Sequence, residues 1–182
     1  MSEIGTRFLN NVLSDNIVFI YFFGILLIFL KGRGLRKSLF TGAKYSSVLL
    51  FISILSWIIS GWIPGQEFLL LWVFLLSSLI GVFILRKWGE LKGEWLGMPE
   101  MIIVMAPFVG LQWFVLEQGI EYFARIFALT ASVFGFYLAF ILVASIREQI
   151  QISEMSDIFK KEASLLMIIA FIVLALVGFT FV

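Results

Sequence analysis

The sequence predicts an all-α integral membrane protein: six transmembrane helices in two inverted three-helix repeats, with short or broken helices at spans one and four. Hydrophobic residues make up 62% of the 182 residues and charged residues only 14%, whereas a soluble domain is about half apolar and about a quarter charged. Six apolar stretches alternate with polar loops. Two short or interrupted stretches occupy corresponding places in the two halves, a pattern typical of inverted-repeat membrane proteins.

The first span covers residues 16–30, NIVFIYFFGILLIFL, and is short for a bilayer. It opens on the polar residue Asn16 and carries Gly24 in its middle. A helix cap and an ion ligand are both open roles for Asn16, since asparagine is a common N-terminal cap.

The fourth span covers residues 101–116, MIIVMAPFVGLQWFVL, and carries Pro107, Gly110 and Gln112. As a helix it would reach about 24 Å, against a hydrocarbon core of about 30 Å. Proline lacks an N–H group and crowds the preceding turn, so we expect a kink or a break. Freed backbone groups at membrane depth must be buried in protein or line a cavity. Together with Asn16 and Gly24, these residues are the candidate midplane site; a tightly packed kink is the alternative.

The remaining elements follow from the apolar pattern. Residues 2–13 place apolar side chains at helical spacing and predict an amphipathic interfacial helix, with a frayed terminus as the alternative. We expect the other spans at about residues 46–63, 68–85, 126–146 and 163–182 of a single membrane domain, residues 1–182, whose repeats cover about 14–88 and 100–182. In the fifth span Ala131, Gly135 and Ala139 recur every four residues, which favours close helix packing.

The placement of basic residues predicts the orientation. With six spans, the loops after spans one, three and five share one side of the membrane. Those loops hold Lys31, Arg33, Arg36, Lys37, Lys44, Arg86, Lys87, Lys92, Arg147, Lys160 and Lys161. The opposite side holds only Arg7 and Arg125. We therefore expect a multi-pass protein of the cell (inner or cytoplasmic) membrane with both termini outside the cytoplasm.

The chain contains no cysteine and no histidine. This excludes disulfides, cysteine-ligated iron–sulfur clusters and ordinary zinc sites formed by this chain. We expect no metal site, no catalytic residues, no cofactor bound by this chain alone and no nucleic-acid partner. Serines 53, 56 and 60 lie on one stripe of the second span, a pattern that usually marks a helix–helix contact.

Several segments in order resemble the six-helix membrane subunits of the Rnf electron-transport complex and the sodium-translocating NADH:quinone reductase (Rnf A/E and Nqr D/E type). They are residues 16–19, 23–24, 41–42, 106–108, 135–139, 146–148, 159–160 and 174–179. The resemblance implies a paired subunit of opposite orientation and an intramembrane iron–sulfur cluster held by cysteines from spans one and four. The matching positions here are Leu26 and Trp113, which cannot bind iron, so this is a divergent member.

The resemblance implies a membrane subunit of an ion-translocating electron-transport complex, serving as scaffold or conduit without its own cluster. The implied partners are a paralogous or identical six-helix subunit and other Rnf/Nqr-like subunits, which would carry any flavin or quinone. The alternative from another class is the substrate-binding subunit of a vitamin-type small-molecule transporter, which also has six helices in a chain of this length.

Overall fold

The computed structural model describes residues 3–13, 15–21, 23–32, 34–62, 67–91, 94–95, 98–118, 121, 124–152 and 162–180. Its helices are α1 (Glu3–Val12), α2 (Ile25–Lys31), α3 (Leu35–Ser60), α4 (Glu67–Lys87), α5 (Glu100–Glu117), α6 (Arg125–Ile152) and α7 (Glu162–Thr180). A two-residue antiparallel pair, β1 (Glu94–Trp95) and β2 (Met98–Pro99), joins α4 to α5. The family-like segment at 159–160 lies outside the described residues.

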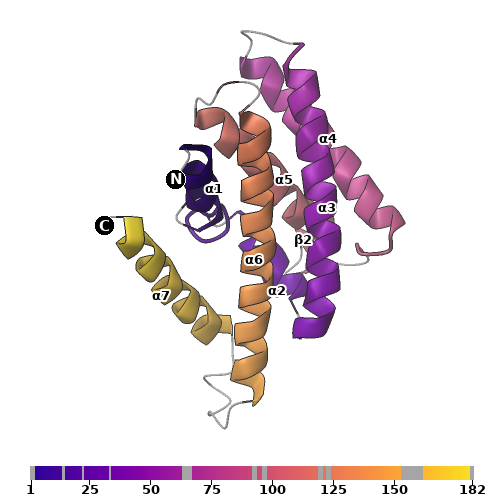
Figure 1. Ribbon diagram of the computed structural model, residues 1–182. Helices are drawn as coiled ribbons and strands as arrows, with labels where there is room; N and C mark the ends of the chain where they lie inside the picture. Colours follow the sequence, from indigo (N-terminus) through magenta and orange to yellow (C-terminus); the bar gives the residue numbers. More distant parts are fainter. Residues whose placement is uncertain are drawn as a thin grey trace.

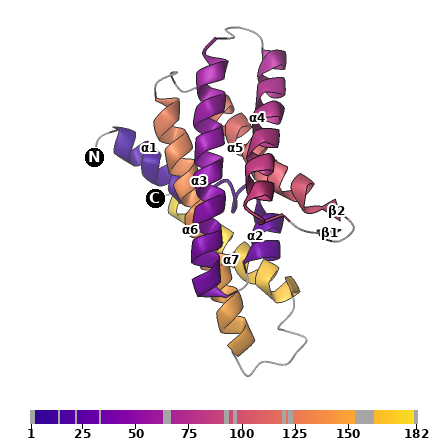
Figure 2. The ribbon, with the colours of Figure 1, turned by 90° about the vertical axis from the view of Figure 1, so that its right-hand side faces the viewer.

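Long helices stand side by side around a central short one. Helix α6 packs along α3, α4 packs against α3 on its other side, and α5 crosses behind them (Figure 1). In Figure 2 the short helix α2 lies below α5, near the lower half of the bundle. Helix α1 lies against α6, while α7 leaves the lower end of α6 and leans away from the bundle (Figure 1).

Four helices in the described part of the chain are long and apolar enough to cross a membrane: α3, residues Leu69–Lys87 of α4, α5 and α6. A shorter apolar stretch, Ser164–Ala175, belongs to α7. The all-helical membrane architecture is therefore confirmed. The count of six spans and the inverted relation of the two repeats stay predictions.

Two helix boundaries differ from the sequence expectation. Helix α3 begins at Leu35, eleven residues before the expected start at 46, so much of the expected basic loop is helical. Helix α6 continues to Ile152, beyond the expected end at 146. In both cases a charged turn extends a helix past its apolar stretch, because backbone hydrogen bonding continues where the side chains reach water.

The expected break in the fourth span is wrong. Helix α5 runs without interruption from Glu100 to Glu117 with Pro107 inside it, although it is short, at 18 residues. Neighbouring elements bury this proline and can re-satisfy the freed backbone, which is how membrane helices tolerate proline. The first span, in contrast, is short: turns make up most of residues 15–21 and 23–24, and α2 has only seven residues.

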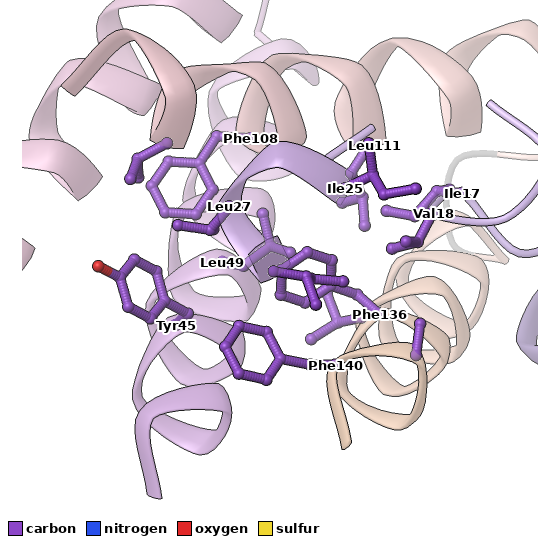
Figure 3. Packing of buried hydrophobic residues seen from close by; sticks show 14 of the residues in the cluster. Ile17, Val18, Ile25, Leu27, Tyr45, Leu49, Phe108, Leu111, Phe136 and Phe140 are labelled. Atoms are coloured by element: carbon purple, nitrogen blue, oxygen red, sulfur yellow. The ribbon is translucent and has the colours of Figure 1, made fainter. Parts of the chain in front are cut away.

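The core lies where α2 meets α3, α5 and α6. Its largest fully buried side chains include Tyr45, Phe108, Phe136 and Phe140. Figure 3 shows these rings gathered around Leu27 and Ile25 of α2, with Leu111 of α5 at the edge. The short helix is thus enclosed by the longer ones.

Charged contacts join the ends of several helices. Lys31 Nζ at the end of α2 lies 3.1 Å from Glu100 Oε2 at the start of α5 and donates to the Glu90 carbonyl at 2.6 Å. Lys44 Nζ of α3 lies 2.6 Å from Glu90 Oε1. Arg147 Nη1 of α6 donates to the Phe29 carbonyl at 2.7 Å. Basic side chains that the sequence places after spans one and five therefore share one end of the bundle with Glu90, which follows span three.

Candidate functional site

Gly24 marks the turn into α2 and brings spans one and four together. Its φ is +87°, a left-handed conformation that side chains with a Cβ rarely adopt. A Cβ added at Gly24 would lie 2.7 Å from Phe136 Cε2 and 3.1 Å from Pro107 Cβ. Only glycine fits this place, where the first-span turn touches the proline of α5 and a ring of α6.

Gly110 is the second close approach between these spans. A Cβ built on Gly110 would lie 2.5–2.7 Å from three atoms of the Phe23 ring. The ring therefore lies against the bare backbone of α5, one turn from Pro107. Because Pro107 and Gly110 are three residues apart, they share the face of α5 that meets the first-span turn.

Asn16 holds the first-span turn to two helices. Its Nδ2 donates to the Val12 carbonyl at 2.8 Å and to the Gly135 carbonyl at 2.9 Å. Its Oδ1 accepts from the backbone N–H groups of Val18, at 2.9 Å, and Phe19, at 3.4 Å. The side chain is 1% exposed and is engaged at both ends. This arrangement favours the capping role over the ion-ligand role.

Gln112 points to another part of the bundle. It lies about 200° around the helix from Gly110 and is buried. Its Oε1 accepts a hydrogen bond from Ser77 Oγ of α4 at 3.2 Å. The five predicted midplane residues therefore divide. Gly24 lies against Pro107, and Gly110 lies against Phe23, the neighbour of Gly24 in the chain. Asn16 bonds to α1 and α6, whereas Gln112 faces α4.

The small-residue stripe on α6 is buried within the chain. Ala131, Gly135 and Ala139 are all buried. A Cβ at Gly135 would lie 2.9 Å from Asn16 Nδ2 and 3.1 Å from the Val12 carbonyl oxygen. At Gly135 the neighbours in close approach are the end of α1, at Val12, and the first-span turn, at Asn16.

The positions that match the family's cysteines face outward. Leu26 of α2 is 42% exposed and Trp113 of α5 is 39% exposed. Trp113 Nε1 donates to Glu117 Oε1 of its own helix at 3.0 Å. Neither side chain offers a thiolate, so these residues do not fit an iron–sulfur cluster. Within the described ranges no three acidic, histidine or cysteine residues gather as metal ligands.

An aromatic group lies beside these outward positions. The rings of Tyr21 and Phe114 are 4.9 Å apart between centroids, and Tyr21 is also stacked with Phe23 at 6.3 Å. Tyr21 is 45% exposed.

The sequence interpretation missed Phe23 and Phe136 as the partners of the glycines. Bulky rings on facing elements are the natural partners of a bare backbone, but the pairing depends on register, which the sequence does not show.

The comparisons agree with the resemblance found in the sequence. The family model described as "Rnf-Nqr subunit, membrane protein" matches residues 4–182. No curated protein matches the chain. Since the family model covers nearly the whole chain, this multi-pass membrane protein belongs to the Rnf-Nqr family of membrane subunits.

Proposed function

We propose that this chain is a membrane subunit of an Rnf/Nqr-like ion-translocating electron-transport complex and serves as scaffold or conduit without its own iron–sulfur cluster. Membership of the family supports the complex. The observation that carries the finer proposal is the pair Leu26 and Trp113: both stand at the family's cysteine positions, and neither can ligate iron. Any flavin or quinone then belongs to partner subunits.

The surface around these two positions is the proposed contact with a paralogous or identical six-helix subunit of opposite orientation. Leu26, Trp113 and Tyr21 are each 39–45% exposed, and the ring of Tyr21 touches α5 through Phe114. An aromatic and aliphatic surface of this kind suits burial against a partner. In the conduit version of the proposal, aromatic side chains such as Trp113 line the position that a cluster occupies in other family members.

The proposal places the chain in the inner or cytoplasmic membrane of the cell, with both termini outside the cytoplasm. Basic residues at one end of the bundle support it, since lysine and arginine concentrate in cytoplasmic loops. Lys31, Lys44 and Arg147 bind acidic side chains or carbonyl groups at that end. The inverted relation of the two three-helix repeats is part of the same proposal.

Site-specific crosslinking tests the proposed contact, and the chain is suited to it because it has no native cysteine. The introduced cysteine of Leu26→Cys or Trp113→Cys is labelled in native membranes with a thiol-reactive photocrosslinker. The chains that it captures on illumination are identified by mass spectrometry. Phe83→Cys is the matched control, at an exposed position of α4 (68%). We expect both test positions to capture a six-helix subunit and the control to capture none.

Three outcomes would contradict the proposal. Capture of the same chains at all three positions would show that the Leu26 and Trp113 surface is no specific contact. Recovery of the tagged chain without partners, together with specific vitamin binding, would favour the transporter alternative. Stoichiometric iron in the purified chain would refute the statement that it holds no cluster.

A further inference from the structure

A small polar pocket lies among α3, α4, α5 and α6, on the side of Gln112 that faces away from the first-span turn. Its volume is about 30 Å³, and it is lined by Ser53, Ser56, Trp57, Ser60, Phe74, Gln112, Val115, Leu116, Arg125 and Leu129. One water needs about 10–15 Å³ of such volume. The pocket therefore has room for one or two waters, or for one monatomic ion.

Three buried polar groups in the pocket lack a hydrogen-bond partner. They are Ser53 Oγ, Ser56 Oγ and Gln112 Nε2, and their residues are 1%, 1% and 4% exposed. An unsatisfied buried polar group costs about 1–3 kcal/mol. Three such groups around one cavity indicate a ligand that satisfies them together.

Buried hydroxyls without a partner also occur away from the pocket, at Ser38, Tyr45, Ser46 and Ser132. The groups at the pocket differ because three of them line one cavity. Other nearby serines are satisfied within their own helices. Ser60 Oγ donates to the Trp57 carbonyl at 2.7 Å, and Ser78 Oγ donates to the Leu75 carbonyl at 2.7 Å. Ser77 Oγ lies 3.0 Å from the Phe74 carbonyl oxygen and 3.2 Å from Gln112 Oε1, so its one hydrogen is shared between two acceptors. With Oε1 next to Ser77, the amide NH₂ group of Gln112 lies on the side away from α4. In this orientation the NH₂ group of Gln112 faces the pocket.

The chemistry of the lining favours an anion. The amide NH₂ of Gln112 can only donate hydrogen bonds, and the two serine hydroxyls can donate as well. Among the described residues that line the pocket, none is acidic and Arg125 is positively charged. Arg125 and Leu129 belong to the first turns of α6, the end of a helix that favours negative charge.

We propose that this pocket binds a small monovalent anion of the size of chloride. Ser53, Ser56 and Gln112 donate hydrogen bonds to the anion, and Arg125 supplies positive charge at its edge. Sulfate, which is larger than chloride and doubly charged, is the comparison anion for this proposal. The site is separate from the Leu26 and Trp113 surface, so it stands whether or not the proposed function does.

Thermal unfolding of the purified full chain in detergent, followed by tryptophan fluorescence, tests the site. Chloride or bromide is compared with gluconate and with sulfate at equal ionic strength. At a halide concentration of about ten times Kd we expect Tm to rise by about 3–6 °C, in a saturable way. Gln112→Leu and Ser56→Ala should abolish or reduce the rise, whereas Ser78→Ala, a buried serine outside the pocket, should retain it.

A second measurement does not depend on the stability of the variants. Crystals of the unaltered chain grown in bromide should show an anomalous scattering peak bounded by Ser53, Ser56 and Gln112. Equal Tm values in chloride and gluconate, or bromide data without a peak in this pocket, would overturn the proposal and leave water as the occupant. A rise of equal size in sulfate would also overturn it, because that effect is not selective for size.

Discussion

The contact between Phe23 and Gly110 allows a quantitative test of whether the first-span turn packs on α5. In Gly110→Ala the new Cβ would meet three ring atoms at 2.5–2.7 Å, so the ring or the helix must move. Overpacking of this kind costs about 1–3 kcal/mol. Alanine in place of glycine within a helix gains about 0.5–1 kcal/mol. The net expectation is that Gly110→Ala lowers the free energy of unfolding by up to about 2.5 kcal/mol.

The same substitution should act in the opposite direction when the ring is absent. In a Phe23→Ala background no ring opposes the new Cβ, so only the helix term remains and Gly110→Ala should stabilise by up to about 1 kcal/mol. The helix term cancels in the double-mutant cycle, which leaves a coupling energy of about 1–3 kcal/mol.

Unfolding of all four proteins in mixed micelles, by titration with a denaturing detergent, measures the cycle. Tryptophan fluorescence reports the transition, since the chain has six tryptophans. Independent sites add within about 0.3–0.5 kcal/mol. A coupling energy below that limit would show that the Phe23 ring does not contact Gly110. The packing of the first-span turn against α5 would then be wrong.

Three further predictions concern other contacts of the same bundle. Asn16→Ala should destabilise by about 2–6 kcal/mol in the same titration, since it removes four hydrogen bonds worth about 0.5–1.5 kcal/mol each. A loss under about 1 kcal/mol would contradict the capping role. Gly135→Leu should reduce recovery of the folded chain and its complex on size-exclusion chromatography far more than Leu138→Ala, because Gly135 is buried and Leu138 is 37% exposed. Equal recoveries would contradict the prediction that the Gly135 face of α6 is the packed one. Lys31→Met should destabilise the chain more than Lys44→Ala, since the Lys31 side chain is 19% exposed and the Lys44 side chain is 49% exposed. Exposed ion pairs contribute about 0–1 kcal/mol. The reverse order of the unfolding midpoints would refute this prediction.

Much of the architecture could be predicted because hydrophobicity and glycine content are local properties. The apolar stretches identify the membrane helices, and the glycine in a short first span indicates a turn there. Pro107 and Gly110 are three residues apart and therefore share one face of their helix. The first-span turn can pack against that face. Close packing at Gly135 follows in the same way from the recurrence of small residues every four positions.

The candidate site could be predicted only in part, because residues close in sequence on a helix point in different directions. Gly110 and Gln112 lie on opposite faces of α5, where they meet Phe23 and Ser77, whereas Trp113, one turn beyond Gly110, is partly exposed. The sequence suggests one site where the structure has a packed contact, a polar pocket and an exposed surface.

By itself the sequence determined the membrane class of this protein, the shortness of its first span and the absence of thiols at Leu26 and Trp113. Only the tertiary structure decided that α5 continues through Pro107 and that α3 begins at Leu35. The physical reason is that a helix ends where its backbone hydrogen bonds find other partners. In the bundle those partners depend on packing with distant segments, and side-chain polarity does not reveal them.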